Sequence, residues 1–479
     1  MNKKKLVSDY LFNLIRMIMK IGLPVITLPF VINRIGVENY GVFSFTNSII
    51  SYFTMAAVLG IPDYASRAIA RETATSSDIE VIGKTASEIL VIQFISVSIV
   101  LILFFTLFYP FFFPEYRSIF LIFSILIASN YFSTEWFYMG QQKFKYIAIR
   151  SMITKLLNVA AILLVIKDGD DSSKYVLITV LTNVLNGLIN ISGIIPYLRF
   201  KNLSIKPHLK PIFILFGLSI SGLINGSIDK TLTGFLVGPI YVGYYAIGLR
   251  LTRITQQVFS SLNSIVFPRV TAYLAKDDEA QSEKLIRFSM DYITLFSFPM
   301  ILGLILYAKD IITLFFKPEL LPAAGALIIL TGTVPVIAIL RIIRTHVLLA
   351  RSKDKILIIL SLITTFSNLL MNLILVPHYK HIGAATATLI AESSGMIFGM
   401  IYIRKKFKIR LLFPGQMKYF IAATVLLIPW WLGNIYLLSM NLILSLTIKV
   451  MISAILYFSM LYLIKDDLFY RYTKRYIIK

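Results

Sequence analysis

The first long apolar stretch of the chain, residues 10–32, reads YLFNLIRMIMKIGLPVITLPFVI. A helix rises about 1.5 Å per residue, so about 20 mostly apolar residues are enough to cross the hydrocarbon core of a bilayer. The stretch is too long for the apolar region of a cleaved signal peptide, and it has no small-residue cleavage site. We therefore interpret it as a transmembrane helix.

The rest of the chain has the same character. Of its 479 residues, 57% are hydrophobic and only 15% are charged, whereas a soluble domain carries about 25% charged residues. The sequence therefore predicts an all-α integral membrane protein of about fourteen transmembrane helices. The apolar runs between charge clusters place these helices near residues 10–32, 42–62, 85–109, 118–138, 146–166, 175–198, 211–236, 241–266, 288–308, 320–346, 356–376, 382–403, 417–435 and 442–464.

The distribution of basic residues predicts the orientation. Lys and Arg total 47 against 24 Asp and Glu, an excess that in a soluble protein would indicate a nucleic-acid partner. Here alternate loops, starting from the N-terminus, hold 31 of the basic residues and the opposite loops hold 7. Loops rich in Lys and Arg stay in the cytoplasm. We expect a multi-pass protein of a cytoplasmic membrane with both termini inside, and no nucleic-acid partner.

An internal repeat divides the chain. Gly36 and Gly41 align with Gly238 and Gly243 at an offset of 202, and the same offset brings Arg67 onto Arg269. Because six helices separate the copies, both copies have the same orientation. Transporters built from such parallel repeats bind substrate between their halves and alternate access to it. The predicted parts are a six-helix bundle over 1–205, a second over 206–410, and two additional helices with a cytoplasmic tail over 411–479.

Several short segments carry a family resemblance. Residues 28–36 read LPFVINRIG, 40–45 read YGVFSF, 60–64 read GIPDY, 67–72 read RAIARE and 229–231 read DKT. Together with the predicted helix arrangement, these segments resemble those of the polysaccharide transporters, or Wzx-type flippases, of the multidrug/oligosaccharidyl-lipid/polysaccharide exporter superfamily.

The resemblance implies a substrate and partners. It implies that the chain moves undecaprenyl-diphosphate-linked oligosaccharide repeat units from the inner to the outer leaflet of a bacterial cytoplasmic (inner) membrane, for a surface polysaccharide such as O-antigen or capsule. The partners that it implies are the polyprenyl-diphosphate-linked oligosaccharide, membrane lipids, and the polysaccharide polymerase with its chain-length machinery.

Charged residues within the predicted spans are the candidate site, because ionisable groups in a membrane usually face a cavity or a partner. Arg250 and Arg253 share a helix face roughly 9 to 12 residues, or about 13–18 Å, from the outer end of their helix. We predict that they line a basic cavity that neutralises a lipid diphosphate, since arginine's planar fork suits phosphate oxygens. The predicted substrate-binding residues are Arg250, Arg253, Lys230, Lys20 and Arg16.

Two other sets of charges have alternative interpretations. Asp229 lies at a depth similar to that of Arg250, and it is either the ion-pair partner of Arg250 or a carboxylate that couples transport to protons or sodium. Arg341 and Arg344 lie near the cytoplasmic end of their helix, where we favour side chains that extend to the lipid headgroups.

The sequence offers no catalytic residues and no cofactor site. It has no cysteine, no phosphate-binding Gly-rich loop with Lys, and no further ligand near His378 and His381, so we predict no metal site. We therefore expect a transporter and not an enzyme. The alternatives are a cation-coupled multidrug exporter, whose cavity should favour acidic residues, and a peptidoglycan-precursor flippase. A membrane polymerase fits less well, because the outside loops are short.

Overall fold

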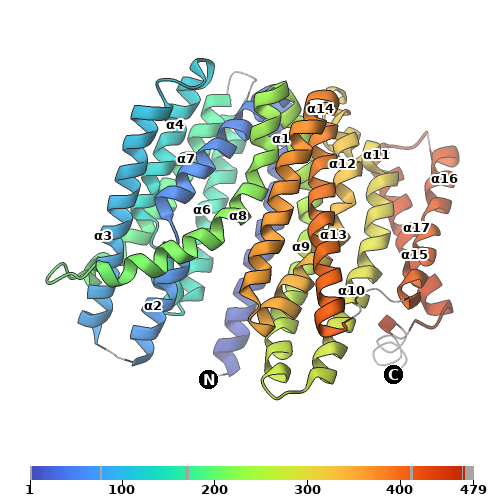
Figure 1. The fold of residues 1–479 in the computed structure, drawn as a ribbon. Coiled ribbons are helices and arrows are strands. Elements are labelled where there is room, and N and C mark those ends of the chain that lie inside the picture. Colours follow the sequence, from blue (N-terminus) through green and yellow to red (C-terminus); the bar gives the residue numbers. More distant parts are fainter. Residues whose placement is uncertain are drawn as a thin grey trace. The chain divides into compact units, whose positions relative to one another are not determined.

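The structure is a computed structural model that describes residues 3–75, 78–167, 172–409, 411, 414–437, 439–466 and 468–469. Within these ranges it does not describe the side chains of residues 3–21, 24, 218–225, 258, 260, 261, 264 and 414. The described residues form helices joined by short turns, with no strand among them (Figure 1). The chain divides into two compact units, residues 1–243 and 244–479, and each is described by itself.

Helices cover the predicted spans, and the structure also contains a helix over 61–75, most of which the sequence placed in a loop. The first unit holds α1 (Lys3–Val58), α2 (Ile61–Thr75), α3 (Ile79–Leu103), α4 (Arg117–Ala128), α5 (Glu135–Gly140), α6 (Phe144–Val165), α7 (Ser172–Ser192) and α8 (Lys206–Val237). From the end of the first unit, α9 (Pro239–Leu274) continues into the second. The second unit adds α10 (Glu279–Leu306), α11 (Ala308–Phe315), α12 (Ala323–Thr331), α13 (Thr333–Ile342), α14 (Asp354–Phe407), α15 (Met417–Thr424), α16 (Leu427–Tyr436) and α17 (Leu442–Leu463).

The helices are built for a membrane. Among the described residues, ten helical stretches are long and apolar enough to cross one. Large apolar side chains also lie exposed along them, such as Leu164 and Leu463 at 74% and Phe366 at 67%. Water would disfavour so much exposed apolar surface, whereas lipid tails accept it. The chain is a multi-pass helical membrane protein. The count of fourteen spans, the repeat and the division at 205 and 410 stay predictions.

Two long helices contain a break in their backbone. Gly36 interrupts α1 with φ 82° and ψ 164°, and Lys380 interrupts α14 with φ 53° and ψ −129°. Both breaks lie where the sequence predicts loops between consecutive spans. Gly238, between α8 and α9, has φ 96° and ψ 164°, close to the conformation of Gly36. Gly36 and Gly238 are glycines that the predicted repeat aligns, so equivalent positions have the same backbone conformation.

In the first unit, α1 packs against α3, α4, α6, α7 and α8, and α2 packs against α3, α5 and α8. Lipid tails are as apolar as the side chains, so helices in a membrane associate through close packing and polar contacts. Small residues allow that approach. A Cβ atom on Gly41 would overlap the backbone of Pro239. The buried core around α1, α3 and α4 is aromatic, with Phe45, Phe104, Phe120 and Phe123.

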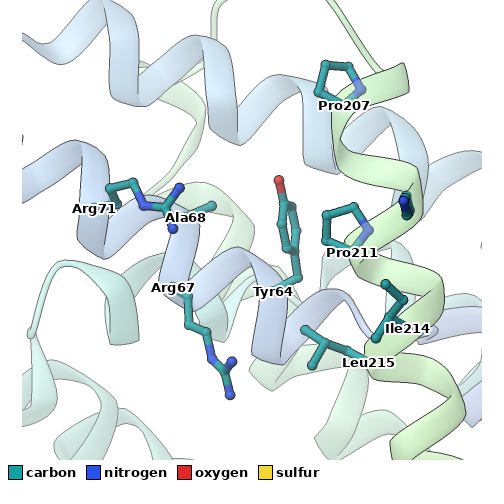
Figure 2. Close-up of a pocket in the computed structure, with 9 residues that line it drawn as sticks. Tyr64, Arg67, Ala68, Arg71, Pro207, Pro211, Ile214 and Leu215 are labelled. Carbon is teal, nitrogen blue, oxygen red and sulfur yellow. The ribbon is translucent and has the colours of Figure 1, made fainter.

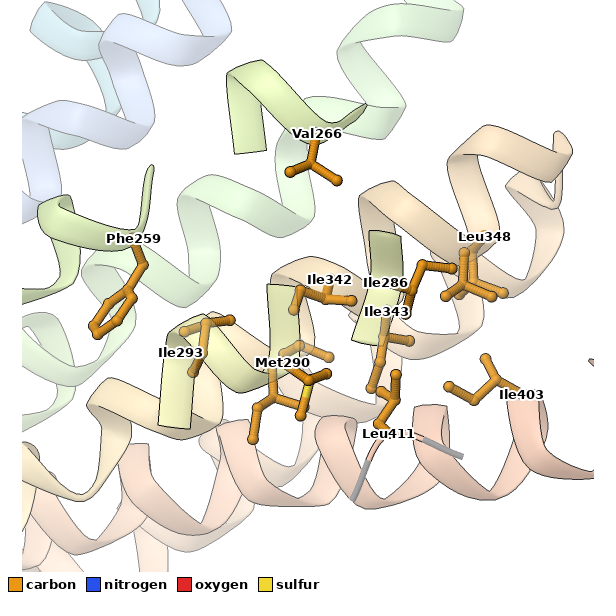
Figure 3. Packing of buried hydrophobic residues seen from close by; sticks show 14 of the residues in the cluster. Phe259, Val266, Ile286, Met290, Ile293, Ile342, Ile343, Leu348, Ile403 and Leu411 are labelled. Carbon is orange, nitrogen blue, oxygen red and sulfur yellow. The ribbon is translucent and has the colours of Figure 1, made fainter. Parts of the chain in front are cut away.

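In the second unit, one apolar cluster joins four helices (Figure 3). Phe259 and Val266 of α9 belong to this cluster with Ile286, Met290 and Ile293 of α10, Ile342 of α13, Ile343 and Leu348 of the following π-helical turn, and Ile403 of α14. A second cluster packs α15 and α17 against Leu295 of α10. These contacts fix α9, which carries Arg250 and Arg253, and the π-helical turn that follows α13.

Candidate functional site

Hydroxyl groups connect α1 to α8. The hydroxyls of Ser48 and Thr231 lie 2.8 Å apart, and those of Ser51 and Ser227 lie 3.0 Å apart. The Tyr52 hydroxyl lies 3.3 Å from that of Thr231. We call these five residues the polar seam. Hydroxyl hydrogen bonds of this kind hold membrane helices together and give the seam a polar surface inside the first unit.

Asp229 and Lys230 lie on α8 within this region. The Asp229 carboxyl is only 3% exposed, and it acts electrostatically on the Tyr52 hydroxyl. Lys230 is half-buried, and both residues have polar interactions. A carboxylate in the apolar layer is expensive and is normally retained for a function. The burial of Asp229 beside the polar seam is consistent with the ion-coupling hypothesis. The pairing of Asp229 with Arg250 stays a prediction.

Arg250 and Arg253 lie on α9 and are both exposed. Neither has a hydrogen-bond or ion-pair partner among the residues that the structure describes in the second unit. They follow the helix start at Pro239 by roughly 11 and 14 residues, or about 16 and 21 Å along the axis. An exposed guanidinium at that depth cannot be solvated by hydrocarbon, which favours a wet cavity beside this face of α9.

Two other embedded cations have protein partners. Lys449 of α17 is 5% exposed, and its Nζ donates to Asn434 Oδ1 at 2.7 Å and lies 3.6 Å from Asp310 Oδ2. Arg150 of α6 is also buried, and its Nη2 donates to Glu135 Oε2 at 2.5 Å. The charge of each is thus neutralised by a carboxylate of the protein, although the Arg150 Nε and Nη1 atoms are buried without a hydrogen-bond partner in the described part of the chain. This contrast separates Arg250 and Arg253 from cations with a structural role.

Arg344 is a candidate that the sequence did not identify. It lies in the π-helical turn Ile343–Leu348, and its Nε and Nη2 atoms are buried without a hydrogen-bond partner in the described part of the chain. A side chain that extends to the headgroups would expose these atoms, so its arrangement differs from the one we favoured. Buried unpaired donors are costly, and π-helical turns are frequent at functional sites.

The remaining predicted residues can be placed only in part. Arg16 and Lys20 lie on α1, four residues apart, but their side chains lie outside those that the structure describes. Within the described ranges, no three His, Asp or Glu side chains gather closely enough to hold a metal ion. The His381 Nε2 atom lies 3.1 Å from the Pro322 carbonyl oxygen, within hydrogen-bond distance.

A multi-pass helical fold with unpaired cations inside its spans is typical of a transporter of charged solutes. The chain matches the family model described as "Polysaccharide biosynthesis protein" over residues 6–274, more than half of its length. It belongs to that family.

Two curated relatives resemble the chain. A "Putative O-antigen transporter" of Escherichia coli K12 is 22% identical over 391 residues, which cover 80% of this chain and 92% of that protein. A "Probable low-salt glycan biosynthesis flippase" of Haloferax volcanii is 26% identical over 205 residues, 41% of this chain. The chain spans less than half of that second relative, 43%.

Solved structures share the fold. The "Lipid II flippase MurJ, inward closed conformation" superimposes with a TM-score of 0.76 at 20% identity, over 96% of this chain and 99% of that one. An inward-facing multidrug resistance MATE family transporter of the MOP superfamily gives 0.66 at 14% identity, over 84% and 98%. The family model confirms the resemblance to the polysaccharide transporters that was stated from the sequence, and the solved structures show that the fold is shared with these exporters.

Proposed function

We propose that this protein is a flippase that moves a polyprenyl-diphosphate-linked oligosaccharide from the inner to the outer leaflet of a bacterial cytoplasmic membrane. The family, the relatives named as a glycan flippase and an O-antigen transporter, and the fold shared with a lipid II flippase all support this function. The exposed, unpaired Arg250 and Arg253 on α9 carry the proposal, because their charge suits an anionic lipid.

The physical task is to lower a solvation barrier. A lipid that carries a diphosphate and several sugars must cross about 30 Å of hydrocarbon. On the way, the sugars lose their hydrogen bonds to water and the phosphates lose their hydration. Guanidinium groups and hydroxyls that replace water lower this barrier, while the polyprenyl tail stays in lipid. Arg250 and Arg253 would bind the diphosphate, and Lys230, Lys20 and Arg16 are the further proposed substrate-binding residues.

Alternating access between the two bundles is the proposed movement, and Asp229 is the candidate for ion coupling. No catalytic step is needed, since the substrate leaves chemically unchanged. For the pathway we propose a surface polysaccharide such as O-antigen or capsule, with the polymerase and chain-length machinery acting on the translocated unit.

A cation-coupled multidrug exporter is the second candidate. The shared fold with multidrug transporters and the buried Asp229 carboxyl favour it. However, a site for organic cations needs an excess of acidic residues, and Arg250 and Arg253 would repel such substrates.

A liposome experiment separates the two functions. Purified full-length protein is reconstituted with a labelled lipid-linked oligosaccharide, and a membrane-impermeant reagent reads how fast the label reaches the outside. We expect faster exposure than in protein-free liposomes, and no export of a cationic dye. Dye export without lipid flipping would support the exporter.

A deletion strain tests the same proposal in cells. We expect the lipid-linked unit to accumulate on the cytoplasmic leaflet and the surface polymer to be lost. If the polymer is lost while the lipid-linked unit is already outside, the defect lies in polymerisation, and the flippase function is rejected.

A further inference from the structure

A second basic site lies between α2 and α8, on residues that no part of the proposed transport cavity uses. A pocket of about 590 Å³ opens there, within the range of small-molecule sites. Tyr64, Arg67 and Arg71 line it from α2, and Pro207, Lys210 and Pro211 line it from α8 (Figure 2). Tyr64, Arg67 and Arg71 are three and four residues apart, and Lys210 and Pro211 follow Pro207 by three and four residues, so one face of each helix forms a wall.

The two helices are held close together at one end of this pocket. A Cβ atom on Gly60, just before α2, would overlap the backbone of Ile212 and contact that of Phe216, so only glycine allows this approach. Within α8, Pro211 has no N–H to donate to the Pro207 carbonyl, and its ring fixes the backbone. The backbone of the α8 wall is therefore rigid at Pro211.

A buried hydrogen-bond network fixes the α2 wall. The Tyr64 hydroxyl lies 2.6 Å from His208 Nδ1, and His208 Nε2 lies 2.8 Å from Glu88 Oε2 on α3. Glu88 Oε1 accepts a hydrogen bond from the Ser204 backbone N–H at 2.7 Å. An ionised Glu88 carboxylate accepts a hydrogen bond from the Nε2–H of His208, so the His208 Nδ1 atom accepts a hydrogen bond from the Tyr64 hydroxyl. The Glu88 carboxylate is thereby committed to His208.

The cations of the pocket remain without counter-ions. Arg67, Arg71 and Lys210 are exposed, and none of them forms an ion pair with any carboxylate that the structure describes. Three such charges around a concave surface attract an anion. Arginine can bind phosphate oxygens with two parallel hydrogen bonds.

The neighbouring surface is apolar. Ile214, at the edge of the pocket, is 58% exposed, and the adjacent Phe213 is 55% exposed. The loop charges predict that this end of the unit, where α2 ends and α8 begins, faces the cytoplasm. A ligand here would meet cations and an apolar, lipid-facing surface at once, which describes the headgroup region of a lipid.

We propose that this pocket binds the phosphate of an anionic lipid headgroup at the cytoplasmic leaflet. Two lipids carry this chemistry: the anionic phospholipids of the membrane and a polyprenyl diphosphate. A phospholipid would anchor the end where α2 and α8 meet. A polyprenyl diphosphate would be captured on the side where such lipids are made. Either binding event can be measured without transport, so its failure leaves the proposed function untouched.

The test measures lipid binding to the full-length protein in detergent, by native mass spectrometry and by titration. The probes are phosphatidylglycerol, a polyprenyl diphosphate and, as a water-soluble anion, inorganic pyrophosphate. The triple variant Arg67→Gln/Arg71→Gln/Lys210→Gln removes the cations. The matched control Arg269→Gln/Lys276→Gln/Lys284→Gln removes the same charge from exposed positions elsewhere. Ala68→Trp fills the pocket and keeps its charges.

We expect the pocket triple variant to bind at least one of the two lipids about a hundredfold more weakly, since each cation near a membrane surface contributes roughly a fivefold factor. The control should bind like the native protein, and Ala68→Trp should weaken binding although no charge is lost. Loss for phosphatidylglycerol identifies a membrane lipid, and loss confined to the polyprenyl diphosphate identifies the transport substrate. Equal binding by the pocket and control variants, or loss for inorganic pyrophosphate alone, would overturn the proposal.

Discussion

Among the arginine and lysine residues inside this protein, two pairs contrast in their surroundings. Lys449 and Arg150 each contact a carboxylate, so their charge is neutralised within the protein. Arg250 and Arg253 contact none among the described residues of the second unit and lie exposed on α9. A charge that the protein does not neutralise must be solvated by water or by a ligand, and this requirement gives the second pair its functional role.

We predict that Arg250→Ala combined with Arg253→Ala reduces flipping in the liposome assay by at least about a hundredfold, because a hydrogen bond to a charged group contributes roughly 1.5–3 kcal/mol. The protein should still accumulate in the membrane, since neither side chain packs in a core. Lysine replacements should retain part of the activity, because they keep the charge and lose the bidentate geometry.

Arg269→Ala is the matched control, an exposed arginine on the same helix. It should flip substrate at the native rate. Native transport by the double alanine variant would reject the phosphate-binding role of this face.

The sequence predicts the positions of these charges along their helices but not the residues that they contact. Arg150 and Glu135 are separated by a helix boundary, and Lys449 and Asp310 lie in helices far apart in the chain. Neither pair follows the helical spacing that makes pairs recognisable within one element. The burial of the Arg344 nitrogens depends likewise on tertiary packing around the π-helical turn. Depth along a helix can be predicted from sequence, and the identity of the facing atoms cannot.

At the scale of elements, two glycines occupy breaks between consecutive helices. Gly36 and Gly238 adopt positive φ values that non-glycine residues rarely take. A Cβ atom at either position would meet nothing within 4 Å. Space is therefore available, and backbone conformation alone requires glycine.

We predict that Gly36→Ala and Gly238→Ala each destabilise the protein by about 1–3 kcal/mol, the range for a strained backbone conformation. Their apparent Tm, measured by the loss of monodisperse protein after heating, should fall by several degrees. Gly303→Ala is the control, because its Cβ would also meet nothing within 4 Å and its backbone, inside α10, has no positive φ. An equal Tm for all three variants would contradict the backbone explanation.

Hydropathy predicted where the helices lie, and it did not predict the irregular turns inside them. The expected span 118–138 contains α4, a 3₁₀ turn over Ser129–Phe132 and α5. The span 42–62 ends early, because the backbone turns at Leu59 and Gly60 before α2 begins. Apolar residues occupy helices and turns alike in a membrane, so their pattern contains little information about such breaks.

At the scale of the whole molecule, the loop charges predict one orientation. The outside loops hold seven basic residues and the opposite loops hold 31. By the positive-inside rule, the loops with 31 basic residues lie in the cytoplasm. The pocket between α2 and α8 depends on this orientation, because its proposed ligand is placed on the cytoplasmic side.

We predict that the positions after Lys206 and after Lys479 lie in the cytoplasm, where a fused fluorescent protein is active and fused alkaline phosphatase is not. A fusion in the 168–174 loop should show the opposite pattern, because this loop is predicted to lie outside. A fusion-by-fusion comparison of alkaline phosphatase with a fluorescent protein measures each location. An external C-terminus would remove the last pair of spans. An external Lys206 would place the α2–α8 pocket in the wrong leaflet.

The contact between Lys449 and Asp310 also has a consequence for how the protein is made. Synthesis proceeds from the N-terminus, so α11 leaves the ribosome before α17. A lysine at the centre of a helix opposes insertion by about 2.5–3.5 kcal/mol. When Lys449 reaches the translocon, the carboxylate that will neutralise it has already been delivered. Because Asp310 precedes Lys449 in the chain, α17 enters a membrane that already contains the carboxylate that neutralises Lys449.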